Sequence, residues 1–271
     1  MVNNQALKAK LAYLKVACFT LLTSLMLTGC VTTTSGGFTS TASDERAVED
    51  YVNLAVGYYD VNDMAGARRN ISNALKVDDR NSTIYNVLAL ILQREGDIRL
   101  AQETFERAIS LDGDNARARN NYAALLFSIQ DFQEAYDQLE QVVSDSMYEG
   151  RAIAFENLGR SALMIGKIDE AKNAFQRALQ LNSNLYLSAL ELSIIQLNRN
   201  DLPGARSAFT QYLTIVGFYK ITHPPKALLA GIKIESSFNN QKLVDEFSML
   251  LMTLYQDTPE YKTYLELTNA N

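Results

Sequence analysis

The chain has 271 residues, of which 47% are hydrophobic and 21% are charged, and its formal net charge is -6. This composition provides enough apolar material for a large core and excludes general disorder. The acidic balance argues against a nucleic-acid partner, because binding phosphates requires clustered lysine and arginine.

Residues 1–29 are predicted to be a secretory signal peptide. Three lysines and no acid precede an apolar run of about twelve residues from Val16 to Leu27. A stable membrane span needs about 20 apolar residues, whereas a basic start before a short apolar run is typical of a secretory signal. An uncleaved anchor helix is the alternative interpretation.

The end of this run, Leu27-Thr28-Gly29-Cys30, resembles the lipobox of bacterial lipoproteins. The resemblance implies cleavage before Cys30 and attachment of a lipid to its thiol, which would tether the protein to a membrane. Val31 stands where inner-membrane lipoproteins usually carry aspartate, so the resemblance implies a lipid-anchored protein of the outer membrane that faces the periplasm.

Residues 30–47 are predicted to comprise the lipidated cysteine and a flexible linker. The stretch 31–43 reads VTTTSGGFTSTAS, which carries no charge and is rich in Ser, Thr and Gly. Thirteen such residues have an end-to-end distance of roughly 20 Å. The linker would therefore let the folded part stand off the membrane and turn freely.

From residue 48 onward one pattern recurs at intervals of 34 to 36 residues. Each unit carries a small residue followed four positions later by a bulky apolar one, a spacing typical of stacked helical hairpins. In the first half of each unit a bulky position is followed directly by a small one. The small residues of the second halves are Ala67, Ala101, Ala135, Ala171 and Ala205, their bulky partners are Ile71, Phe105, Leu139, Phe175 and Phe209, and the bulky positions of the first halves are Leu54, Leu88, Tyr122, Leu158 and Leu192.

This pattern resembles the tetratricopeptide repeat (TPR), although the proline usual near the end of each unit is absent. The resemblance implies an all-α superhelical solenoid with five clear repeats, a degenerate sixth and a C-terminal capping helix. An irregular helical bundle is the alternative. The TPR domain is expected over residues 48–271, with repeats at about 48–81, 82–115, 116–149, 152–185 and 186–219 and the degenerate unit at 224–257.

In TPR proteins the first helices of the units line a wall that binds extended peptides or helices. The repeat register predicts a partner-binding groove of amide, apolar and arginine side chains, in which asparagine could pair with the backbone of a partner. The alternative is that these are solvated positions on a helix face. The predicted groove residues are Val52, Asn53, Val56, Tyr59, Asn86, Leu90, Gln93, Arg117, Asn120, Asn121, Phe127, Asn157 and Arg160.

Enzyme chemistry is not expected. The one histidine, His223, lies in a Thr-His-Pro-Pro stretch that predicts an exposed connection, and no glycine-rich phosphate loop occurs. One histidine and two cysteines, Cys18 and Cys30, cannot supply a metal site of several His or Cys ligands. We therefore expect no catalytic residue, no metal and no cofactor other than the covalent lipid on Cys30.

Two stretches, Asn115–Leu126 with the following Phe132–Tyr136, and Tyr148–Gly159, carry a closer resemblance. Together with the lipobox, the short linker and the repeats, they are similar to the type IV pilus biogenesis/stability lipoproteins, the PilF/PilW family of secretin pilotins. That resemblance implies a protein that binds secretin subunits and promotes their localisation and assembly. A different periplasmic TPR lipoprotein scaffold, for example in outer-membrane protein assembly or cell-wall synthesis, is the alternative.

Overall fold

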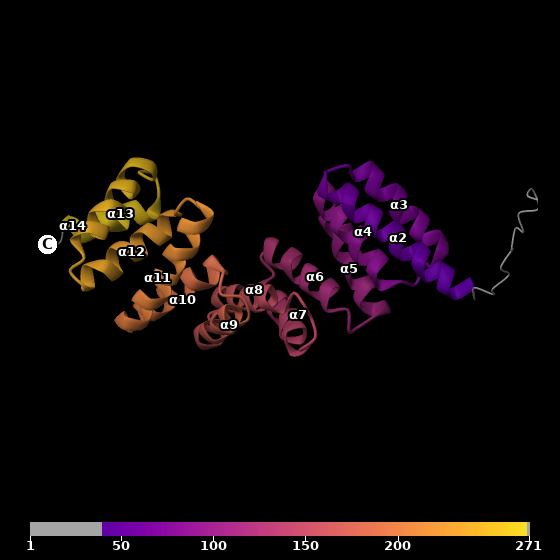
Figure 1. The fold of residues 1–271 in the computed structure, drawn as a ribbon, viewed down its shortest axis with the longest axis horizontal. Coiled ribbons are helices and arrows are strands. Elements are labelled where there is room, and N and C mark those ends of the chain that lie inside the picture. The colour runs from indigo at the N-terminus through magenta and orange to yellow at the C-terminus, as the bar shows by residue number, and fades with distance from the viewer. Residues whose placement is uncertain (1–39, 270–271) are drawn as a thin grey trace, which may run out of the picture. The chain divides into compact units, whose positions relative to one another are not determined.

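The computed structural model of the chain describes residues 40–269, with side chains from residue 43 onward, so the predicted signal peptide and Cys30 lie outside the described residues. Over this range the chain forms thirteen α-helices and no strand, and none of these helices is long and apolar enough to cross a membrane. The helices, coloured from indigo to yellow in Figure 1, are α2 (Ser40–Asp60), α3 (Met64–Val77), α4 (Ser82–Glu95), α5 (Ile98–Leu111), α6 (Ala116–Ser128), α7 (Phe132–Ser144), α8 (Arg151–Met164), α9 (Ile168–Leu181), α10 (Tyr186–Asn198), α11 (Leu202–Tyr219), α12 (Pro225–Ser237), α13 (Gln241–Leu254) and α14 (Pro259–Asn269).

The helices pack as a stack of hairpins. From α4 onward each first helix packs on the second helix that follows it, as α4 does on α5 and α8 on α9, and each second helix from α3 to α11 also contacts the first helix of the next hairpin. Successive first helices touch as well, from α4 through α12, and α14 packs on α12 at the end of the stack. This arrangement confirms the predicted fold class, an all-α TPR solenoid.

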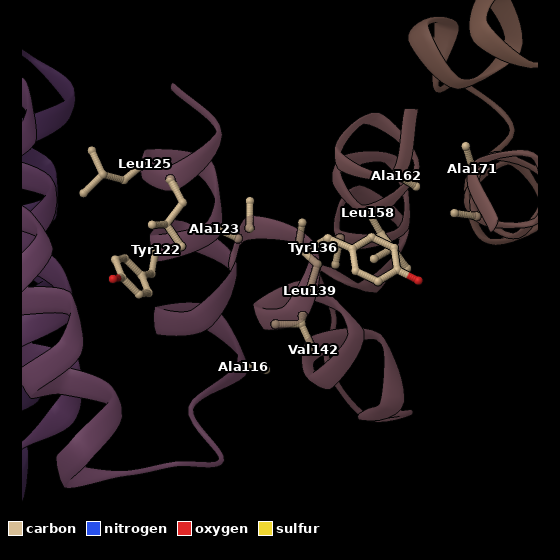
Figure 2. Packing of buried hydrophobic residues seen from close by; sticks show 14 of the residues in the cluster. Ala116, Tyr122, Ala123, Leu125, Tyr136, Leu139, Val142, Leu158, Ala162 and Ala171 are labelled. Carbon is tan, nitrogen blue, oxygen red and sulfur yellow. The ribbon is translucent and has the colours of Figure 1, made fainter. Parts of the chain in front are cut away.

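The repeated small and bulky positions form the core. The five alanines of the second helices are fully buried, and their bulky partners are at most 1% exposed. Figure 2 shows the central part of this core, where Leu139 and Val142 of α7 pack near Ala123 of α6 and Leu158 of α8. Because alanine adds little beyond the backbone, the two helices of a hairpin can approach closely enough for the bulky residue to fill the space between units.

The first hairpin differs at its outer face. Leu54 of α2 is 51% exposed, whereas Tyr122 and Leu158, at the same repeat position, are 4% and 8% exposed. Within the described range no hairpin precedes α2, so nothing there covers the face that carries Leu54. The inner face of α2 packs normally, with Val52 and Ala55 in one cluster with Ile71.

The turns inside the hairpins share one backbone conformation. The residue that ends each first helix or follows it closely has positive φ, as in Gly96 with φ 87° and Gln130 with φ 67°. Aspartates then precede several second helices, and the Asp131 carboxylate accepts a hydrogen bond from the Glu134 N–H at 3.3 Å, which satisfies a backbone donor in the first turn of α7. The left-handed residues of these turns are Asn62, Gly96, Gln130, Gly166, Asn200 and Asn239.

The predicted linker is corrected at its C-terminal end. The sequence predicts a linker that reaches residue 47, but α2 begins at Ser40. Val48, in the third turn of this helix, is already buried in the core cluster. The packing of α2 from Val48 onward therefore lets the helix extend back into the polar segment that precedes it.

Candidate partner-binding site

Eight of the predicted groove residues line one cavity of about 660 Å³. They come from the first helices of three successive hairpins, α2, α4 and α6, and we call this cavity the N-terminal groove. Its lining consists of the predicted residues Val52, Asn53, Val56, Tyr59, Asn86, Leu90, Arg117 and Asn121 together with Asp60, Thr83, Val87, Asn115 and Tyr148.

The N-terminal groove combines an apolar surface with isolated charges. Val56 is 37% exposed beside the buried Val52, and the guanidinium of Arg94 lies 4.2 Å from the centroid of the Tyr59 ring. Burial raises the pKa of the Tyr148 phenol, while the positive charge of Arg117 acts in the opposite direction. The lining therefore combines apolar side chains with one cation, Arg117, and one carboxylate, Asp60.

Several of the amides expected to bind a partner instead connect neighbouring hairpins. The Asn121 Nδ2 donates to Asn86 Oδ1 at 2.9 Å, and the Asn157 Nδ2 donates to Asn120 Oδ1 at 3.5 Å. Asn86 is only 2% exposed, so its side chain serves the stack rather than the open surface.

These contacts continue along the stack as what we call the polar ladder, one pair between each two successive first helices from α4 to α12. Between α8 and α10 the buried Glu156 carboxylate accepts hydrogen bonds from the Ser188 hydroxyl at 2.7 Å and the Ser188 N–H at 3.0 Å. The four pairs are Asn86–Asn121, Asn120–Asn157, Glu156–Ser188 and Glu191–Lys226.

The remaining predicted residues lie elsewhere. Phe127, Asn157 and Arg160 line a smaller cavity of about 210 Å³ between α6 and α8. There the Arg160 guanidinium lies 4.5 Å from the centroid of the Phe127 ring. Asn120 lines neither cavity but accepts the hydrogen bond from Asn157, and Gln93, near the end of α4, also lines neither cavity.

Sequence reasoning missed a larger cavity of about 810 Å³ near the C-terminal end of the stack. Side chains of α12, α13 and α14 line it, with smaller contributions from the turn between α10 and α11. Its apolar lining includes Ile232, Val244, Met249, Met252 and Leu267. Met249 and Met252 of α13 could have indicated this cavity from the sequence, because they recur at helical spacing beside the core positions Phe247 and Leu251.

His223 is not the exposed loop residue that the sequence predicts. Its side chain is half-buried, with Nδ1 3.0 Å from the Tyr212 hydroxyl, and its backbone oxygen accepts a hydrogen bond from the Tyr255 hydroxyl at 2.8 Å. Burial lowers the pKa of His223. Across residues 40–269 no group of three or more His, Cys, Asp or Glu side chains is placed to hold a metal ion.

Comparisons with known proteins agree with this architecture. Two tetratricopeptide-repeat family models match residues 92–146 and 152–185. Over 251 residues the chain is 29% identical to the type IV pilus assembly protein PilF of Pseudomonas aeruginosa, covering 92% of this chain and 97% of PilF. The solved structure of P. aeruginosa PilF superposes with a TM-score of 0.77 at 27% identity, over 83% of this chain and 99% of that one.

A second solved structure, PilW, described as a widely conserved type IV pilus biogenesis factor, superposes with a TM-score of 0.65 at 26% identity. It covers 80% of this chain and 98% of PilW. The repeats and their packing thus define a TPR protein. The resemblance to PilF and PilW is confirmed, and the chain is a relative of these type IV pilus biogenesis proteins.

Proposed function

We propose that this protein is an outer-membrane lipoprotein that binds secretin subunits through the N-terminal groove and promotes their localisation and assembly for type IV pilus biogenesis. The observation that carries the proposal is the N-terminal groove itself, in a chain similar to PilF over 92% of its length. The protein acts as a scaffold and not as an enzyme, and it needs no metal or cofactor besides the lipid on Cys30.

In this proposal the lipid supplies the location and the groove supplies the recognition. A protein held at the periplasmic face of the outer membrane meets its partner in two dimensions, which raises the effective concentration of each for the other. Modest affinity in the groove is therefore sufficient. The secretin segment that binds would present apolar side chains to Val56 and Leu90 and an acidic group to Arg117.

The groove is tested by the substitution Val56→Glu. Val56 is already 37% exposed, so a charge there should leave the fold intact while burying an unpaired carboxylate under any bound apolar segment. We expect at least a tenfold loss of secretin capture in a pull-down with purified secretin subunits. The matched control is Val61→Glu, at a position 74% exposed just beyond α2 and outside the groove lining, which should capture secretin normally. Equal capture by both variants would remove the groove from the proposal.

The alternative scaffold role is separated by deletion of the gene. If the protein serves secretin assembly, the deletion strain should lose heat-stable secretin multimers on a gel together with surface pili. Normal multimers and normal pili would instead favour a scaffold for outer-membrane protein assembly or cell-wall synthesis.

A further inference from the structure

Helix α11 is longer than the other second helices and ends in two exposed aromatic rings. It has 18 residues, whereas α3, α5, α7, α9 and α13 have 13 or 14. Phe218 is 79% exposed and Tyr219 is 54% exposed. Their ring centroids lie 4.9 Å apart with an interplanar angle of 85°. We call Phe218, Tyr219 and the following Lys220 the aromatic tip.

The aromatic tip is not required by the core. The face of α11 that packs in the stack is supplied by Phe209, Tyr212, Ile215 and Val216, all of which are buried. The two neighbouring exposed rings form a contiguous apolar patch, a kind of surface that contacts proteins or membranes in other molecules.

The base of the aromatic tip is held in place. The connection that follows it is fixed by hydrogen bonds between His223 and the hydroxyls of Tyr212 and Tyr255, one from α11 itself and one next to α13. Lys220 ends the helix in a left-handed conformation with φ 55°. The rings therefore project from an ordered element of the fold.

The charged residues nearest to the aromatic tip in the sequence are basic, opposite in sign to the net charge of the chain. The chain carries a net charge of -6, yet the segment from Leu202 to Ile234 contains four basic residues and no acidic residue. Two of the four, Arg206 and Lys226, form ion pairs with Glu235 and Glu191. Lys220 adjoins the two rings directly. The tip thus joins aromatic rings to a cation in an otherwise acidic protein.

We propose that the aromatic tip inserts into the headgroup region of an anionic phospholipid bilayer. Aromatic side chains, Tyr in particular, are favoured at the level of the headgroups, and a nearby lysine is attracted by anionic lipids. The inference rests on the proposed lipid on Cys30 only for bringing the domain to the bilayer. A flexible tether alone limits how far the domain can move from the bilayer but leaves its orientation to the bilayer free. A second contact point would fix the orientation of the stack on the membrane.

The absence of tryptophan from the chain makes a direct test possible. The variant Phe218→Trp carries a single indole at the tip, and its control Met164→Trp carries one at an exposed position, 55% accessible, at the end of α8. Each full-length lipidated protein is reconstituted into vesicles of phosphatidylethanolamine and phosphatidylglycerol. We expect the emission of the indole at the tip to shift to shorter wavelength and to be quenched by brominated lipids, while the indole of the control emits as in water.

A second arm separates insertion from anchoring. In a chain made without residues 1–30, which carries neither the predicted signal peptide nor the lipid, Phe218→Ser with Tyr219→Ser should reduce sedimentation with the same vesicles several-fold relative to the chain with intact rings. Water-like emission of the Phe218→Trp variant in the proteoliposomes would overturn the inference while leaving the lipid anchor and the groove untouched. A shift that occurs only after secretin is added would also overturn it, because it would assign the tip to a protein contact.

Discussion

At the scale of single residues, one close contact between the helices of a hairpin depends on a glycine. Gly159 occupies the small position of the first helix that other units fill with Ala55, Ala89 or Ala123. A Cβ atom at residue 159 would lie 2.7 Å from Cε1 of the buried Phe175 ring. The sequence shows that this position is small, but only the structure shows that even a methyl group is too large there.

We therefore expect Gly159→Ala to destabilise the fold by about 1–3 kcal/mol, the usual cost of overpacking a core. Thermal unfolding followed by circular dichroism measures the change. Gly57→Ala is the matched control, since a Cβ in that helical position meets nothing within 4 Å, and there alanine should stabilise the helix by up to about 1 kcal/mol. If both variants melt at the same temperature, the tight contact with Phe175 is not real.

His223 should make stability depend on pH. Burial lowers the pKa of this side chain in the folded state, against a smaller opposing influence of Glu246, so the unfolded chain binds the proton more readily. Its contribution is complete above the unfolded pKa of about 6.5 and is lost as the pH falls through the lower, folded pKa.

The melting temperature should therefore fall between about pH 7.5 and about pH 5.5, and His223→Gln should reduce that fall because glutamine does not titrate there. Identical pH profiles for the parent and the variant would show that the imidazole is as well solvated in the fold as in the unfolded chain. The sequence could not reveal this burial, because Tyr212 and Tyr255 reach the histidine only through tertiary packing.

At the scale of helices, the polar ladder holds neighbouring first helices at a set separation. A double-mutant cycle on Asn86→Ala and Asn121→Ala should give a coupling free energy of about 0.5–1.5 kcal/mol, the net value of one hydrogen bond between side chains. Chemical denaturation of the parent, the two single variants and the double variant measures it. Strictly additive losses would mean that the two amides do not bond in solution. Asn53→Ala, also in the groove but exposed, is the control for general effects of amide loss.

The period of the sequence predicted the stack of hairpins well, because each core position recurs in every unit, so that a weak match in one unit is supported by the matches in the others. It could not predict features that occur in one unit only. The early start of α2, the extra turn of α11 and the cavity between α12, α13 and α14 have no counterpart in the other hairpins. The groove followed from the register, whereas the bonding of Asn86 to Asn121 depends on which residues face each other across two units.

At the scale of the whole molecule, the proposed function needs the lipid as much as the groove. Cys30→Ser should leave an unprocessed precursor outside the outer membrane, because the thiol that accepts the lipid is gone. Membrane fractionation followed by immunoblotting measures this. Cys18→Ser provides the matched control, since Cys18 lies within the predicted signal peptide and its loss should not alter processing. Normal fractionation of the Cys30 variant would contradict the lipobox interpretation.

The contacts between neighbouring hairpins also determine the order in which parts of the protein unfold on heating. Each hairpin is stabilised only by the units beside it, so a linear array of this kind melts from its ends inward instead of all at once. The N-terminal groove is built from α2, α4 and α6, at one end of the described array. Warming should therefore abolish partner binding by the groove at a temperature where most of the helical circular-dichroism signal persists. A bound partner would stabilise the first hairpins and raise the temperature at which they unfold.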